Sequence, residues 1–508
     1  MYGLTRAPSI DRPDLQWFNV PRPLSLADLR GRLVILDFWT SCCVNCLHVQ
    51  PTLGRIRRAF PGQVVVIGVH SPKFTAERDP ESLRHAIARA GITHPVVHDP
   101  DMSIGKEYCV RAWPTLVFVA PDGMILGDLR GEPDAQRVID GIGMMMRTWK
   151  EDGLLKPPAR GADPAAPATR AADGEAALRY PGKIRAAHRH GERLWAIADT
   201  GHHRILVADD GGAIRAVYGR GQAGHLDGPA DRCAFSSPQG LDCDEDFIYV
   251  ADTGNHALRR IDRATGAVAT LAGAGRRGCA LRTPAKGADT ALASPWDVIL
   301  AHGRLLFANA GTHQIGQMCL TSGYVEPLAG NAREGLCDGP ALDAVLAQPS
   351  GLALSADGMA LYVADSETSA IRRVGLGADA RVDTLVGKGL FDFGHVNGPL
   401  CAARLQHATG LAFCDGAVLV ADSYNHRLRS LDLAAGRMTD LDLPGGVALH
   451  EPSGLVADGP HRLLVSDTNN HRILEIDRAA GTVHTWMGGP SGSVGESVEE
   501  SGAKTPCR

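Results

Sequence analysis

Two cysteines three residues apart, Cys43 and Cys46, form the segment of this chain with the clearest chemistry. An apolar run precedes the pair and a helical pattern follows it, so the cysteines lie at a strand-to-helix junction. Backbone amides at the helix start favour the thiolate of Cys43, which makes Cys43 the predicted nucleophile. Cys46 lies one turn inside the helix and suits the resolving role, which is attack on a mixed disulfide. The pattern therefore predicts thiol-disulfide exchange.

A carboxylate, Asp37, lies within the otherwise apolar run before the cysteines. Burial raises the pKa of a carboxyl group in such a run, and this group is placed to take a proton from Cys46. The alternative interpretation of the two cysteines is half of a structural zinc site. No second Cys or His pair at ligand spacing follows within the domain, so we predict no metal there.

Two further thiols are candidates for accessory roles. Cys42 is adjacent to the predicted nucleophile and is able to form a strained vicinal disulfide with it. Cys109 lies further along the chain, where a third redox partner is one interpretation. An ordinary thiol is the simpler interpretation of each.

The elements that must position these residues can be followed along residues 1–150. The run Leu33–Trp39 predicts a buried parallel strand, and apolar residues at helical spacing predict a helix from Cys46 to Phe60, with a kink at Pro51. The remaining pattern predicts strands at 64–69, near 96, at 115–119 and at 124–129, and helices at 80–90 and up to about 149. Strands that alternate with helices before a hairpin predict an α/β domain.

Two stretches of this domain resemble the thioredoxin-like family. Asp37-Phe-Trp-Thr-Ser-Cys-Cys-Val-Asn-Cys46 is similar to the family's cysteine signature, and Tyr108-Cys-Val-Arg-Ala-Trp-Pro-Thr115 is similar to its cis-proline stretch. The resemblance implies a cis Trp113–Pro114 bond beside the cysteines and substrate contacts from Trp113, Pro114 and Thr115. The chain departs from the family at Cys42, where a tryptophan is usual, and at Val-Asn, where Gly-Pro is common.

A second part of the chain is built from one recurring unit. Its six copies begin at Asp199, Asp252, Asn309, Asp365, Asp422 and Asp467. Each copy follows one strand pattern, which in most copies comes after a unit like Gln348–Ala353, and two further strand patterns follow the copy. This predicts four strands per unit and a closed six-bladed β-propeller. The unit resembles the NHL repeat, whose Asn-His pair recurs at Asn425-His426 and Asn470-His471. The Asp-Gly-Pro or Asn-Gly-Pro turns between blades are expected to project from one face of the disc.

Histidine and aspartate recur in almost every copy, which raises the question of a metal site. The histidines are His203, His256, His313, His426 and His471. A residue that recurs in every blade serves a turn or an interstrand hydrogen bond, whereas a site generally uses residues that break the repeat. We therefore predict structural roles for these histidines, and turn-forming roles for the aspartates.

The order of the parts resembles the NHL-repeat-containing protein 2 family in a bacterial-type form. The predicted organisation is a thioredoxin-like domain at 1–150, a Pro/Ala-rich linker at 151–179, a six-bladed NHL-repeat propeller at 180–488 and a disordered tail at 489–508. The fold class is thus multidomain, with an α/β domain followed by an all-β propeller.

Composition limits the function classes. The net charge of -5 provides no field for nucleic acid or acidic lipid, and no apolar run approaches a membrane span. The 12 cysteines are mostly scattered, which is typical of reduced thiols in the cytoplasm. We expect no cofactor. The oligomeric state is not indicated.

Two functions remain after these observations. The first is a thiol-disulfide oxidoreductase whose propeller recruits or orients a protein thiol or disulfide substrate at one face. The second is a protein-binding scaffold or redox-sensing module without turnover. A propeller enzyme is a third interpretation, but the sequence shows no convergent, non-repeated metal set for it.

Overall fold

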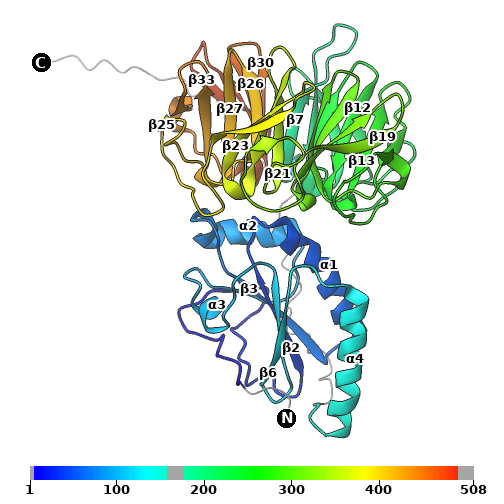
Figure 1. Cartoon of the computed structure of the whole chain (residues 1–508), viewed down its shortest axis with the longest axis vertical. Coiled ribbons are helices and arrows are strands. Elements are labelled where there is room, and N and C mark those ends of the chain that lie inside the picture. The colour runs from blue at the N-terminus through cyan, green and yellow to red at the C-terminus, as the bar shows by residue number, and fades with distance from the viewer. Residues whose placement is uncertain (1–4, 157–176, 490–508) are drawn as a thin grey trace, which may run out of the picture. The chain divides into compact units, whose positions relative to one another are not determined.

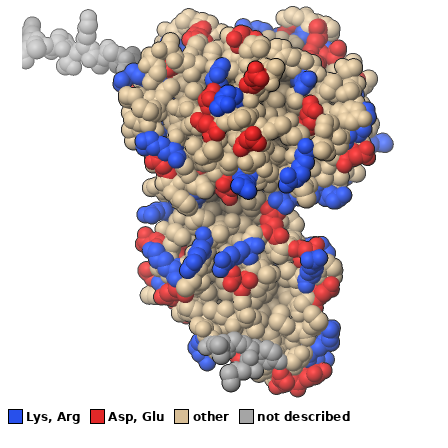
Figure 2. All heavy atoms as spheres, viewed as in Figure 1, with Lys and Arg blue, Asp and Glu red and all other residues tan. Residues whose placement is uncertain are grey.

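The computed structural model describes residues 5–156 and 177–489, which divide into two compact units within residues 1–172 and 173–508 (Figure 1). Most of the predicted linker and the predicted tail, at 157–176 and 490–508, lie outside the described residues. No helix within the described ranges is both long and apolar enough to span a bilayer. Lys and Arg are interspersed with Asp and Glu on the face shown in Figure 2.

The first unit is a six-stranded sheet with helices on its faces. The strand order is β1-β4-β3-β2-β5-β6. The elements, in chain order, are β1 (Trp17–Phe18), β2 (Leu33–Trp39), α1 (Val44–Ala59), β3 (Val64–His70), η1 (Ala76–Arg78), α2 (Pro80–Ala90), β4 (Val96–His98), α3 (Ser103–Glu107), β5 (Thr115–Val119), β6 (Ile125–Arg130) and α4 (Ala135–Glu151). This is the predicted thioredoxin-like α/β domain.

Strand β2 is buried along its whole length because it pairs with β3 in parallel and with β5 in antiparallel orientation. Leu33 and Ile35 pack into a core with α1 and α4, while Val34 and Leu36 pack into a second core on the opposite face. Side chains alternate across a strand, so Asp37 follows Ile35 on the face that α1 covers. The strand thus places the Asp37 carboxylate beneath α1, the helix that begins at the cysteines.

The helix ends show how α1 differs from its neighbours. Asp79 caps α2 by accepting from the Ser82 amide, and Asp134 caps α4 in the same way. The residue at the corresponding position of α1 is Cys43, whose side chain makes no cap hydrogen bond. A thiol therefore occupies the place where polar side chains usually satisfy the first amides of a helix.

The second unit is a propeller of six antiparallel sheets. The first three blades contain β7–β10 (Pro181–Ala186, Leu194–Asp199, Arg204–Asp209, Ile214–Tyr218), β11–β14 (Gly240–Cys243, Phe247–Asp252, Ala257–Asp262, Val268–Ala272) and β15–β19 (Ala285–Lys286, Pro295–Ala301, Arg304–Asn309, Gln314–Cys319, Tyr324–Ala329). The last three contain β20–β24 (Gly339–Pro340, Pro349–Leu354, Ala360–Asp365, Ala370–Gly375, Arg381–Val386), β25–β29 (Gly398–Pro399, Gly410–Cys414, Ala417–Asp422, Arg427–Asp432, Arg437–Asp440) and β30–β33 (Pro452–Asp458, Arg462–Asp467, Arg472–Asp477, Thr482–Gly488).

One strand of each blade faces the centre, and these strands are β7, β11, β16, β21, β26 and β30. Each contacts the inner strand of the next blade, and β30 contacts β7, so the ring is closed. The predicted six-bladed propeller is confirmed. Glycine permits the close approach: a Cβ on Gly351 would lie 2.5 Å from the Thr409 carbonyl oxygen.

The Gly-Pro turns between blades differ from the expectation. Gly339–Pro340 and Gly398–Pro399 pair as β20 and β25 with the outermost strands β24 and β29 of the blades that they precede. Gly228 bridges to Val268 in the second blade in a similar way. The turns therefore lie along the outer edges of blades, where they pair backbone groups that an edge strand exposes.

Candidate functional site

Cys43 and Cys46 occupy different environments in α1. Cys43 is half-buried at the N-cap, whereas Cys46 is buried within the first turn. The Cys46 amide donates to the Cys43 carbonyl at 3.1 Å. None of the cysteines in the described residues is disulfide-bonded. The accessible thiol therefore stands at the helix start and the shielded thiol stands behind it.

Burial raises the pKa of the Cys46 thiol well above its usual value. The hydrogen bond to Cys43 and the charge of the Cys43 thiolate raise it further, and Asp37 adds a smaller electrostatic contribution in the same direction. Cys46 consequently needs a base before it attacks a disulfide. Gln50, one turn after Cys46 in α1, contacts Asp37, so the carboxylate lies beneath the same helix as this thiol.

Asp37 has the properties of such a base. It is fully buried, and burial raises its pKa to about 7, although a hydrogen bond from Gln50 counteracts part of this effect. Gln50 Nε2 donates to Asp37 Oδ2 at 3.0 Å, while Asp37 Oδ1 has no hydrogen-bond partner. The carboxylate therefore takes up and releases a proton near neutral pH. No local motif in the sequence marks Gln50.

The segment Trp113–Thr115 reaches the cysteines through Trp113. The Trp113–Pro114 peptide bond is cis. Trp113 and Cys43 are packed against the apolar cluster that contains Cys46. The Thr115 hydroxyl donates to the Ala112 carbonyl at 2.8 Å, which holds the segment in place. The structure thus brings Cys43, Cys46 and Trp113 together.

The two candidate accessory thiols lie in unlike surroundings. Cys42 is buried, and its sulfur lies 3.6 Å from the Thr40 hydroxyl oxygen. Cys109 is exposed just after α3, in a left-handed backbone conformation, and is not part of the apolar cluster around Cys46. Of these two thiols, Cys42 is the one next to Cys43 in the chain.

The repeated histidines join neighbouring blades. Each has a left-handed backbone, with φ between +53° and +56°. Nδ1 of each accepts the backbone amide of a residue in the next blade at 3.0–3.1 Å, and the donors to His203, His256, His313, His426 and His471 are Ser237, Ser294, Gln348, Glu451 and Tyr180. Ser369 accepts the His407 amide at the remaining junction. Among the described residues, no group of three or more His, Cys, Asp or Glu side chains is arranged to hold a metal ion.

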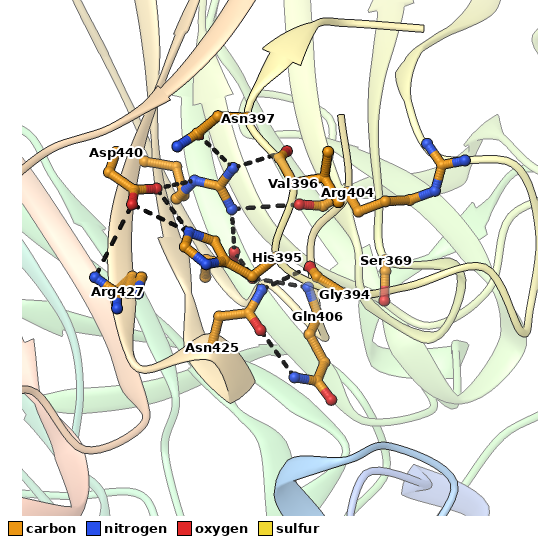
Figure 3. A network of polar contacts seen from close by, with 12 residues as sticks. Ser369, Gly394, His395, Val396, Asn397, Arg404, Gln406, Asn425, Arg427 and Asp440 are labelled. Carbon is orange, nitrogen blue, oxygen red and sulfur yellow. Dashed lines mark hydrogen bonds and ion pairs between the residues drawn. The ribbon is translucent and has the colours of Figure 1, made fainter. Parts of the chain in front are cut away.

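The repeated aspartates are buried, and each is paired with an arginine. The pairs are Asp199–Arg204, Asp252–Arg259, Asp365–Arg372, Asp422–Arg429 and Asp467–Arg472, at 2.7–3.2 Å. In the third blade Asn309 replaces the aspartate, and Gly316 stands where three other blades have the arginine. Figure 3 shows the surroundings in the fifth blade, where Asn425 donates to the Gly394 carbonyl and Asp440 accepts from His395. Each blade therefore has both the buried aspartate and its arginine, or neither of them.

Charged side chains that break the repeat fill the centre of the propeller. Glycine occupies one equivalent position of the inner strand in four blades, as Gly240, Gly351, Gly410 and Gly454, whereas Lys183 and Asp297 stand at this position in the first and third blades. Lys183 donates to the Thr409 and Ser453 carbonyls. Arg185 donates to Asp297 Oδ2 at 3.2 Å. These bonds connect the first blade to the third, fifth and sixth, and they satisfy the charges internally.

Comparisons with known proteins identify both parts of the chain. The profile of a thioredoxin-like family, Thioredoxin_8, matches residues 31–125, which include Asp37 and both paired cysteines. The NHL repeat profile matches residues 405–429, which contain the fifth copy of the recurring unit.

Three relatives show how far the similarity extends. NHL repeat-containing protein 2 of Gallus gallus is 38% identical over 462 residues, which cover 84% of this chain and 62% of the chicken protein. Protein SUPPRESSOR OF QUENCHING 1, chloroplastic, of Arabidopsis thaliana is 36% identical over 88% of this chain and 44% of its own length. Thiol-disulfide oxidoreductase ResA of Halalkalibacterium halodurans is 24% identical over 20% of this chain and 56% of its own length.

Fold and comparisons together define a protein in which a thioredoxin-like domain is fused to an NHL-repeat propeller. Two separate profiles and long alignments that include both parts support this class. The chain is similar to NHL repeat-containing protein 2 along both of its parts, and it spans 62% of the length of the chicken protein.

Proposed function

We propose that the chain is a thiol-disulfide oxidoreductase in which Cys43 is the nucleophile, Cys46 resolves the mixed disulfide and Asp37 is the base. The observation that carries the proposal is the difference between the environments of Cys43 and Cys46. A half-buried thiol stands at a helix start, and a buried thiol with a raised pKa lies near a carboxyl group whose pKa is about 7. A distant relative of this domain is named a thiol-disulfide oxidoreductase.

The reaction follows from these positions. The Cys43 thiolate attacks one sulfur of a substrate disulfide, and the other substrate sulfur leaves as a thiolate that takes a proton. Asp37 then accepts the proton of Cys46, whose sulfur attacks Cys43 and releases the second substrate thiol. The substrate gains two electrons, and the enzyme is left with a Cys43–Cys46 disulfide. A dithiol reductant must reduce this disulfide before the next turnover.

The propeller has a binding role in this proposal. Its repeated aspartates and histidines are occupied by contacts within and between blades, so they support the ring rather than a reaction. We assign to the propeller the recruitment of a protein that carries the substrate thiol or disulfide. Trp113, Pro114 and Thr115 line the substrate position beside Cys43, and the cytoplasm is the proposed location.

A disulfide-reduction assay on the full chain tests the proposal. Insulin reduction should fall on the order of 10³-fold or more in Cys43→Ser, because the attacking sulfur is lost. Cys46→Ser should accumulate mixed disulfides through Cys43, whereas the matched control Cys109→Ser should retain wild-type activity. Wild-type activity in Cys43→Ser, or no turnover by the wild type, would favour the binding-scaffold interpretation.

A further inference from the structure

A buried carboxylate, Glu77, binds the turn that leads into the reactive cysteines. Glu77 Oε1 accepts from the Thr40 hydroxyl at 2.7 Å and the Ser41 hydroxyl at 2.6 Å. The same oxygen accepts from the Cys42 amide at 2.9 Å. These three donors are consecutive, and the next residue along the chain is Cys43. A single oxygen atom therefore fixes the whole turn before the proposed nucleophile.

The second oxygen of Glu77 is held as firmly as the first. Glu77 Oε2 accepts from the Lys73 amide at 2.9 Å and from the Phe74 amide at 2.8 Å. Both donors lie in the loop that precedes η1, the short helix that carries Glu77. The carboxylate therefore joins this loop to the turn at Thr40–Cys42, and it cannot rotate without the loss of hydrogen bonds at both ends.

The environment of Glu77 shows that hydrogen bonds alone retain it. Its exposed fraction is 2%, and within the described parts of the chain it forms no ion pair with a lysine, arginine or histidine. Three backbone amides and two hydroxyls donate to it. Donors of this kind stabilise a buried carboxylate through short, directional bonds, and they determine its position at the same time.

The turn matters because of the place of Cys43 in α1. The Cys43 amide donates to the Thr40 carbonyl at 3.4 Å, so the turn continues directly into the N-cap. No side-chain cap holds the helix start, since the residue at this position is a thiol. Glu77 supplies from outside the helix the restraint that an ordinary cap supplies from within it.

We propose that Glu77 is a positioning residue for the redox reaction, and this inference rests on the proposed function. Glu77 touches neither reacting sulfur. It holds Thr40, Ser41 and Cys42 so that the Cys43 sulfur stands beside the first amides of α1 and within reach of Cys46. Loss of this restraint lets the thiol move away from the helix start and from the attack geometry.

Glu77→Ala in the full chain removes all five acceptor contacts. The pH profile of Cys43 alkylation, read by mass spectrometry, should move to higher pH by about 0.2 to 0.7 units, because the thiolate loses part of its interaction with the helix start. The kcat for disulfide reduction should fall about tenfold or more with little change in KM, since misplaced reacting atoms slow the chemical step. Glu77→Gln keeps an uncharged oxygen for the turn and should give intermediate values.

Asp99→Asn is the matched control for a loss of stability. Asp99 is also a buried carboxylate in this domain, and it accepts from the Ile104 and Gly105 amides at 3.0 and 2.8 Å at the start of α3. This variant should lower stability and leave the Cys43 profile unchanged. If Glu77→Ala prevents folding, Ser41→Ala removes one bond to Glu77 and should shift the profile slightly in the same direction.

Two results would overturn the inference. A Cys43 profile that is unchanged in Glu77→Ala, with a loss of stability like that of Asp99→Asn, would make Glu77 a purely structural residue. If the Cys43 alkylation profile moved to lower pH in both Glu77 variants, Glu77 would act on the thiolate through its negative charge and not by holding the turn in place. Alkylation needs no turnover, so these results are independent of whether the wild type reduces disulfides.

Discussion

Buried carboxylates occur in both parts of the chain, but their surroundings differ. In the propeller, Asp422 accepts from Arg429 at 2.9 Å and from Asn425 at 2.8 Å. In the thioredoxin-like domain, Asp37 accepts from the amide of Gln50, and its other oxygen has no partner. Burial raises the pKa of Asp422 to about 6 against the effects of Asn425 and Arg429, and raises that of Asp37 to about 7.

This contrast separates carboxylates that hold a fold from one that exchanges a proton. A carboxylate paired with a buried guanidinium fixes its neighbours through charge-assisted hydrogen bonds. A carboxylate in an apolar core with one oxygen that accepts no hydrogen bond is costly to ionise, so its pKa rises toward neutral pH. Burial alone does not distinguish the two cases, whereas the set of partners does.

The largest expected effect comes from breaking a pair in the propeller. Arg372→Met leaves Asp365 buried without its cation and should lower the free energy of unfolding of the propeller by about 3 to 5 kcal/mol. The adjacent Arg373→Met is the matched control, because Arg373 is half-exposed and lies 3.6 Å from the exposed Asp383. Its cost should stay within about 0.5 kcal/mol. Equal costs of the two variants in urea unfolding would show that the buried pair holds the propeller no more firmly than the exposed pair.

Asp37→Asn should act in the opposite direction and depend on pH. The folded state raises the pKa of Asp37 to about 7, so ionisation costs stability as pH rises from about 4 to 7. Above pH 7 the variant should be more stable than wild type by about 2 to 4 kcal/mol, and the difference should vanish near pH 4. Hydrogen exchange of β2 measures this effect. Asp128→Asn, at an exposed position, should show no such pH dependence. If Asp37→Asn were more stable than wild type by the same amount at every pH, the proton uptake assigned to Asp37 would be wrong.

A smaller effect is expected at a junction between blades. His471→Ala leaves the Tyr180 amide without its acceptor and should destabilise the propeller by about 1 to 2 kcal/mol. His461, in an exposed turn of the same blade, is the control. Disulfide reduction by both variants should equal that of wild type. Unchanged stability of the His471 variant would show that this bond does not hold the ring.

Much of the fold could be predicted because its signals are local and repeated. Six copies of one unit indicate six blades, and the apolar run at Leu33–Trp39 indicates a buried strand. The structure adds β1, α3 and the short outer strands such as β20. Two-residue strands show no periodicity, and α3 begins after Met102 without a capping side chain. Tertiary pairing determines these elements, so local sequence does not reveal them.

The residues of the candidate site also differ in whether a local sequence signal marks them. Cysteine spacing and an acid in an apolar strand identify Cys43, Cys46 and Asp37 directly. Gln50 and Glu77 carry no such signal, because each acts on a residue that only the folded chain brings near it. Lys183 and Asp297, by contrast, could have been found from the sequence. They replace the glycine of other blades, and an alignment of the six inner strands would have shown it.

The bonds between blades bear on how such a ring can evolve. At each junction the acceptor is a side chain of the recurring unit, while the donor is a backbone amide of the next blade. Residues as different as Ser237, Gln348 and Tyr180 provide this amide equally well, because every residue except proline has one. A duplicated blade therefore brings its own half of the next junction and requires no matching change in its neighbour. Gene duplication and divergence can proceed blade by blade while the ring remains joined.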